Sequence, residues 1–106
     1  MTGTTRKQQI EAMLAGDPGD PFLRYALAME YVGQGDDEGA VRCFRELVGL
    51  AADYVPAYLQ AGQALIRLGR HDEARQLLTQ GVETARKQGD HHAWEEMQGF
   101  LGSLGD

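Results

Sequence analysis

The feature that most constrains this chain is a repeat with a period of 34 residues. Shifting the sequence by 34 positions aligns Gly35 with Gly69 and Ala40 with Ala74. Similar apolar residues align at further positions, for example Phe44 with Leu78. A period of roughly 20–50 residues is typical of proteins built from repeated units, and each unit needs neighbours and terminal caps to bury its apolar face.

Short breaks rich in Gly, Asp and Pro divide the chain into six helix-length segments. Apolar residues recur at helical spacing in these segments, and none shows the alternation of β-branched residues expected of strands. The connections are only a few residues long, so consecutive helices should lie antiparallel. We therefore expect an all-α chain with helices at about residues 5–15, 21–32, 37–51, 55–68, 72–88 and 90–104.

The aligned positions carry a motif of small and large residues. The first unit reads Leu27-Ala28-x2-Tyr31 and Ala40-x3-Phe44, and the second reads Ala61-Gly62-x2-Leu65 and Ala74-x3-Leu78. In this motif the chain resembles the tetratricopeptide repeat family, whose 34-residue unit is a helix–turn–helix. Small residues at these places would let the two helices of a unit approach closely.

The resemblance covers about residues 5–88 and implies one TPR-like domain, 1–106, of antiparallel helix–turn–helix repeats. We expect an N-terminal half-repeat at 5–19, repeats at 20–53 and 54–88, and a C-terminal capping helix at 90–104. The capping helix does not follow the 34-residue register. Three residues depart from the family's pattern, namely Arg24, Ala52 and Gly81.

Charge and composition exclude several classes of function. The net charge is −6, from 16 acidic and 10 basic residues, which disfavours phosphate backbones and anionic membrane surfaces. The longest uncharged stretch near the middle, residues 54–66, is too short and too polar to span a bilayer. Cys43 alone cannot form an internal disulfide, and residues 1–10 lack the apolar run of a signal peptide. We expect a cytoplasmic protein that binds neither nucleic acid nor membrane.

The sequence offers little catalytic or metal-binding chemistry. His91 and Glu95, or His92 and Glu96, would lie one helical turn apart. Zinc sites normally need three or four ligands, so a polar first turn of the last helix is the better interpretation. The residues around Cys43 do not suggest a nucleophile paired with an acid or a histidine. We expect no enzymatic activity, no cofactor and no metal site.

The candidate binding residues form a second apolar stripe on the second predicted helix. Leu27, Ala28 and Tyr31 supply its inward face, while the second stripe continues onto the fourth helix. The first helix can cover part of this stripe through Ile10, Met13 and Leu14 and can bury Phe22, but it should not reach Met29 and Ile66 together. Exposed apolar patches usually mark interaction sites. The predicted binding residues are Phe22, Tyr25, Met29, Leu59, Gln63 and Ile66.

The resemblance also implies a function, because the first helix of each tetratricopeptide repeat lines a concave groove that holds an extended peptide or a partner helix. The best-known variant binds a C-terminal carboxylate through lysine and asparagine. This chain has no asparagine, and neither Lys7 nor Lys87 falls at a groove position, so that variant is disfavoured. We therefore expect a protein-interaction module with an apolar groove. The alternatives are a structural homodimer closed by the same surface and a non-catalytic regulatory subunit.

Overall fold

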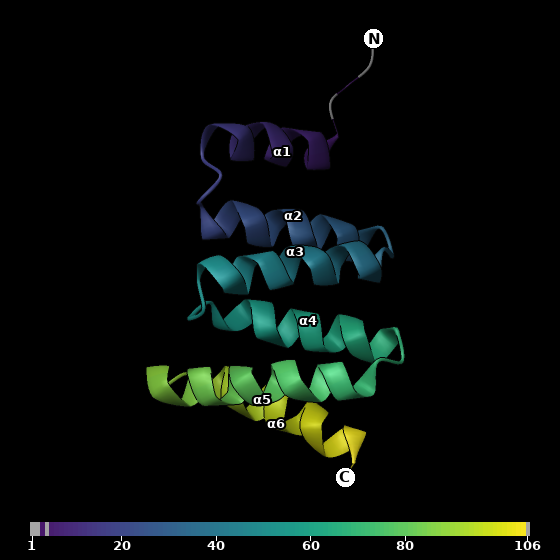
Figure 1. The fold of residues 1–106 in the computed structure, drawn as a ribbon, viewed down its shortest axis with the longest axis vertical. Coiled ribbons are helices and arrows are strands. Elements are labelled where there is room, and N and C mark those ends of the chain that lie inside the picture. The colour runs from purple at the N-terminus through teal and green to yellow at the C-terminus, as the bar shows by residue number, and fades with distance from the viewer. Residues whose placement is uncertain (1–2, 4, 106) are drawn as a thin grey trace.

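The computed structural model describes residues 3 and 5–105, and this part of the chain contains six α-helices and no strands. The helices are α1 (Arg6–Gly16), α2 (Pro21–Gly33), α3 (Asp37–Leu50), α4 (Val55–Arg67), α5 (His71–Gln88) and α6 (His91–Leu104). They stack in chain order along a body of 52 × 28 × 20 Å, with the termini at opposite ends (Figure 1). The predicted all-α class is confirmed, and the predicted helix ends agree to about one residue.

The same turn follows α2, α4 and α5. Each of these helices ends near a glycine in the left-handed region, with φ of 77° at Gly35, 76° at Gly69 and 72° at Gly89. The next amide then donates to a carbonyl five residues back, as from Asp36 to Tyr31 at 2.9 Å. This is the Schellman geometry, which glycine adopts without steric cost. Repetition of this turn reverses the chain in the same way each time, so successive helices pack antiparallel.

Small residues allow close contact at the helix crossings. Ala28, Ala40 and Ala74 are fully buried. A Cβ atom added at Gly62 would lie only 2.4 Å from Leu78 Cδ2, so α4 and α5 could not approach so closely with a larger residue there. The expected role of these small positions is confirmed.

Gly81, one of the departures from the family pattern, has a similar role at the next crossing. A Cβ atom there would lie 2.5 Å from Met97 Sδ and 2.6 Å from Tyr58 Cβ. Gly81 therefore leaves room for Met97 of α6, which is fully buried.

The helix α6 repeats the pattern of α4 after 36 residues rather than 34. The residues before the two helices are Tyr54 and Asp90, and burial matches at Ala57 and Ala93. The longer step arises because α5 has 18 residues whereas α3 has 14, while the connection before α6 is two residues shorter than the one before α4. Since α6 packs on both α5 and α4, it takes the place of the first helix of a further unit.

The helix α1 packs against α2 as the second helix of a preceding unit would. Ile10 is buried, Arg6 forms an ion pair with Glu30 at 3.0 Å, and Lys7 Nζ lies 4.5 Å from the centroid of the Tyr31 ring. At its start, Thr5 and Gln8 form a reciprocal capping box. The first and last helices thus cover the two ends of the stack.

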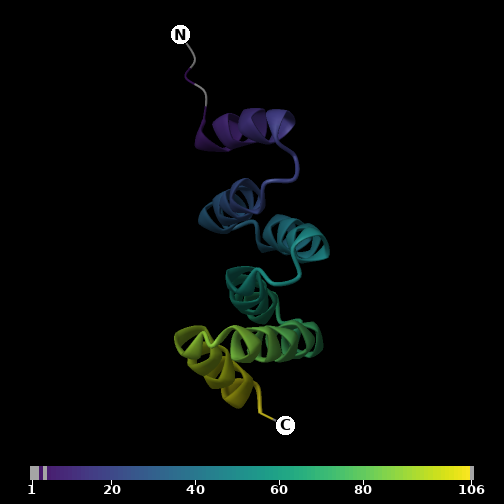
Figure 2. The same cartoon turned by 90° about the vertical axis from the view of Figure 1, so that its left-hand side faces the viewer.

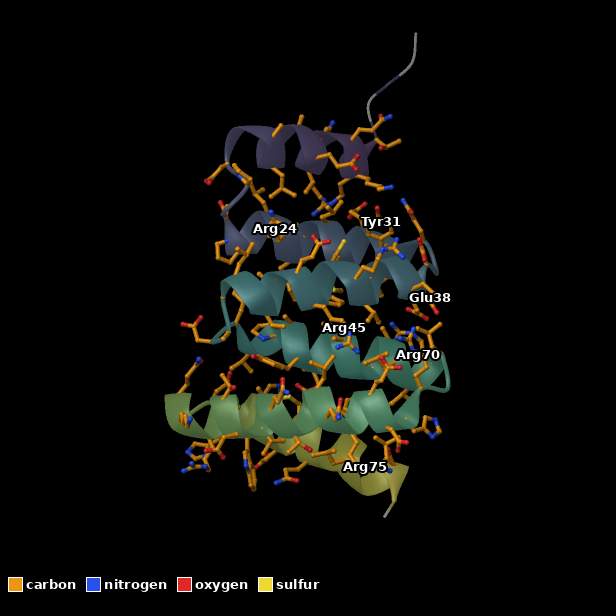
Figure 3. All side chains as sticks on the ribbon, in the orientation of Figure 1. Arg24, Tyr31, Glu38, Arg45, Arg70 and Arg75 are labelled. Carbon is orange, nitrogen blue, oxygen red and sulfur yellow. The ribbon has the colours of Figure 1, made fainter. Side chains whose placement is uncertain are left out.

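Ion pairs connect the two helix pairs along one side of the molecule. Arg70 binds Glu38 of α3 as well as Glu73 of α5, and Arg45 of α3 also reaches Glu73 (Figure 3). Asp37 accepts three hydrogen bonds from Arg67, the shortest at 2.8 Å. Most of these side chains are substantially exposed, and exposed ion pairs contribute little to stability.

Candidate interaction surface

The six predicted binding residues lie on α2 and α4, two helices that form one side of the stack together with α6, whereas α3 lies on the other (Figure 2). We call their surface the α2–α4 face, defined by Phe22, Tyr25, Met29, Leu59, Gln63 and Ile66. Phe22 is 66% exposed, and the other five are half-buried. Tyr25, Met29, Leu59 and Ile66 pack against the core while keeping part of their surface in solvent.

Aromatic contacts fix Tyr25 at the centre of the α2–α4 face. Its ring centroid lies 5.9 Å from that of Phe44 and 5.5 Å from that of Tyr54, and both pairs are tilted. Burial raises the pKa of Tyr25, and a hydrogen bond with the side chain of Gln60 on α4 opposes that rise. Tyr25 therefore joins α2 to both α3 and α4 and is held in one position before any partner arrives.

Tyr54 lies immediately before α4 and contacts Tyr25, a role that the sequence analysis did not predict. Burial and the nearby carboxylate of Asp20 raise its pKa. Only one signal could have found it: Tyr54 is 34 residues after Asp20, the cap of α2, and so occupies the equivalent place before α4.

The helix α1 borders the α2–α4 face but leaves Phe22 exposed. A cavity of about 230 Å³ between α1 and α2 is lined by Met13, Phe22, Leu23 and Ala26, among others. Met13 is 51% exposed and Phe22 is 66% exposed. The helix α1 therefore does not bury Phe22: its ion pair with Glu30 and the contact of Lys7 with Tyr31 lie toward the other end of α2. Its edge instead adds Met13 to the exposed apolar surface.

The histidines of α6 and Cys43, the other candidate functional groups, do not form a metal site or a reactive centre in the part of the chain that the structure describes. His92 Nε2 lies 2.8 Å from Glu96 Oε1 across one turn of α6. Among the described residues, no three His, Cys, Asp or Glu side chains come together as metal ligands would. Cys43 is half-buried, and burial raises the pKa of its thiol, which disfavours the reactive thiolate. Over the same residues, none of the helices combines the length and the apolar character needed to cross a bilayer.

Comparison with known proteins agrees with this geometry. The chain is 34% identical over 95 residues to a TPR repeat-containing protein of Pseudomonas aeruginosa, with 90% of each protein covered. The crystal structure of a tetratricopeptide repeat domain protein from Salinibacter ruber is 38% identical, with a TM-score of 0.75 over 80% of this chain and 94% of that one. A solution structure of a Bordetella parapertussis protein is 27% identical, with a TM-score of 0.83 over 96% of this chain and 89% of that one.

The match to the family itself covers more than half of the chain. Residues 31–95, from the end of α2 into α6, match the tetratricopeptide repeat family. This segment includes the helix crossing at Gly62 and Leu78 and the turns at Gly35, Gly69 and Gly89. The chain belongs to the tetratricopeptide repeat family.

Proposed function

We propose that this protein is an interaction module that holds a peptide or a partner helix on the α2–α4 face. Tetratricopeptide domains generally mediate contacts between proteins. The observation that carries the proposal is the row of apolar side chains that remain partly in solvent across two helices, with Phe22 the most exposed of them. Apolar surface of this kind usually marks an interaction site.

The chemistry of the face suits a protein ligand. Tyr25 offers a large surface whose position is fixed by Phe44 and Tyr54, so little side-chain entropy is lost when a partner binds. Met29 is flexible and can adapt to different side chains. Gln63 offers an amide for hydrogen bonds with a peptide backbone. A face with these three properties can anchor a partner segment without any catalytic group.

Phe22→Gln is the substitution that best tests this function. Phe22 is mostly exposed, so its replacement should change the free energy of unfolding by less than about 0.5 kcal/mol. Met29→Glu is a poorer test, because Met29 packs against the core and its loss would also destabilise the domain. The matched control is Leu50→Gln, which removes another exposed apolar residue, 60% exposed, from α3.

The experiment is affinity capture from the native host with the wild type and both variants, together with mass measurement in solution. Loss of the captured proteins with Phe22→Gln, but not with Leu50→Gln, would support the proposal. Equal capture by all three proteins would contradict it. A wild-type dimer that Phe22→Gln converts into monomers would instead assign the α2–α4 face to homodimer formation.

A further inference from the structure

The residue types at equivalent positions of α2, α4 and α6 change from apolar to acidic along the stack. Because α4 follows α2 by 34 residues and α6 follows α4 by 36, Tyr25 corresponds to Leu59 and then to Glu95. The position of Met29 is taken by Gln63 and then by Gly99. At these positions the stack thus carries an aromatic and an aliphatic residue on α2, an aliphatic and an amide side chain on α4, and an acidic and a small residue on α6.

The cations near this side are already engaged. Within α1, α2 and α4, all of which the structure describes, Arg6 pairs with Glu30, Arg24 with Glu46, and Arg67 with Asp37. Lys7 lies over the ring of Tyr31. The helix α6 has no lysine or arginine, and Glu95 and Glu96 are both exposed on it. A partner would therefore meet apolar surface at one end and exposed carboxylates at the other.

A shallow depression on the surface of α6 offers a place for a long cationic side chain. It has a volume of about 370 Å³ and is lined by Glu96, Gly99, Phe100 and Ser103. The aliphatic part of a lysine or arginine could pack on the half-buried Phe100 ring while its charged end reaches Glu96. His92 contacts the same carboxylate at 2.8 Å but carries a full charge only when protonated.

We propose that the partner is a cationic amphipathic segment, with apolar side chains on the α2–α4 face and lysine or arginine over Glu95 and Glu96 of α6. This inference rests on the proposed function and specifies the chemistry of the partner. Charge also distinguishes this partner from a second copy of the chain. Each copy has a net charge of −6, so two copies repel each other, whereas a basic segment is attracted.

The test uses labelled synthetic peptides of about 18 residues, long enough to form a helix. The first has leucine on one helical face and lysine on the other. The second has glutamate in place of lysine, and the third keeps lysine but has serine in place of leucine. Fluorescence anisotropy with the full-length protein should show binding of the leucine–lysine peptide, weakened at least about 10-fold between about 0.05 M and 0.5 M NaCl. The other two peptides should bind at least about 10-fold more weakly.

Matched variants separate the local effect of α6 from the effect of net charge. Glu95→Gln combined with Glu96→Gln should weaken binding of the leucine–lysine peptide about 5-fold. Asp72→Asn combined with Glu83→Gln removes the same number of charges from α5, where both residues are exposed, and should change binding less than about 2-fold. Circular dichroism should show that both double variants remain folded.

The outcomes distinguish the two proposals. If both double variants weaken binding equally, or if the leucine–glutamate peptide binds as tightly, the inference about cationic partners is wrong. The proposed function would survive that result if Phe22→Gln still weakened binding. If Phe22→Gln had no effect on any peptide that binds, the α2–α4 face would not be the binding surface, and both proposals would fail.

Discussion

The replacement of Gly62 by alanine tests the close contact between α4 and α5. Alanine is favoured over glycine inside a helix by about 0.5–1 kcal/mol. At position 62, however, its Cβ atom would lie 2.4 Å from Leu78 Cδ2 and 2.5 Å from Leu78 Cγ. Leu78 is fully buried and has little room to move, and overpacking of this kind typically costs about 1–3 kcal/mol. We expect Gly62→Ala to lower the free energy of unfolding by about 1–2 kcal/mol.

Gly99→Ala is the matched control for this experiment. Gly99 lies inside α6, and nothing would lie within 4 Å of an added Cβ atom, so the intrinsic preference for alanine should raise stability by about 0.5–1 kcal/mol. Urea denaturation followed by circular dichroism measures both effects. In a Leu78→Ala background the clash is absent, and Gly62→Ala should then become neutral or stabilising. A rise in stability with Gly62→Ala alone, equal to that with Gly99→Ala, would refute the assigned distance between the helices.

Three further predictions concern packing, turn geometry and ionisation. Ala40→Leu or Ala74→Leu should each cost about 1–3 kcal/mol, because both sites are fully buried at helix crossings, and wild-type-like thermal melting would contradict this. Gly69→Ala should cost about 1–2 kcal/mol because φ is 76° there, and Gly69→Asn should cost less, as urea midpoints would show. Burial raises the pKa of Tyr25 above its ordinary value of 10.0, so the unfolded tyrosine ionises first. The free energy of unfolding should therefore keep its full value below about pH 10 and decrease at higher pH. In urea titrations at increasing pH, Tyr25→Phe should make this decrease smaller.

The helices and turns could be predicted because their signals are local. A glycine after an apolar helical stretch, as at Gly35 and Gly69, directly indicates the left-handed residue that ends a helix. The position of α6 relative to α4 was harder to predict. The 34-residue alignment fails there because α5 is four residues longer than α3 and the connection after it is two residues shorter, so Trp94 takes the place of Tyr58 only after a step of 36.

The candidate surface could be predicted in outline but not in its degree of exposure. Helical spacing places Tyr25 and Met29 on one side of α2, which requires no tertiary information. The exposure of Phe22 depends on where α1 packs on its neighbour, and the contact of Tyr25 with Tyr54 depends on how the loop before α4 returns to α2. Both arise from contacts between segments whose relative placement the sequence pattern does not encode locally.

The sequential stacking of the helices has a consequence for chain length. The helices that pack extensively are neighbours or next neighbours in the described chain, and the side-chain hydrogen bonds between units join residues 28–35 positions apart. A duplicate of residues 20–53 inserted after position 53 would therefore present α4 with the same α3 surface that it meets now. The protein could be lengthened by whole units without redesigning its ends, and because every contact stays short in sequence, the longer chain should fold about as rapidly as the original.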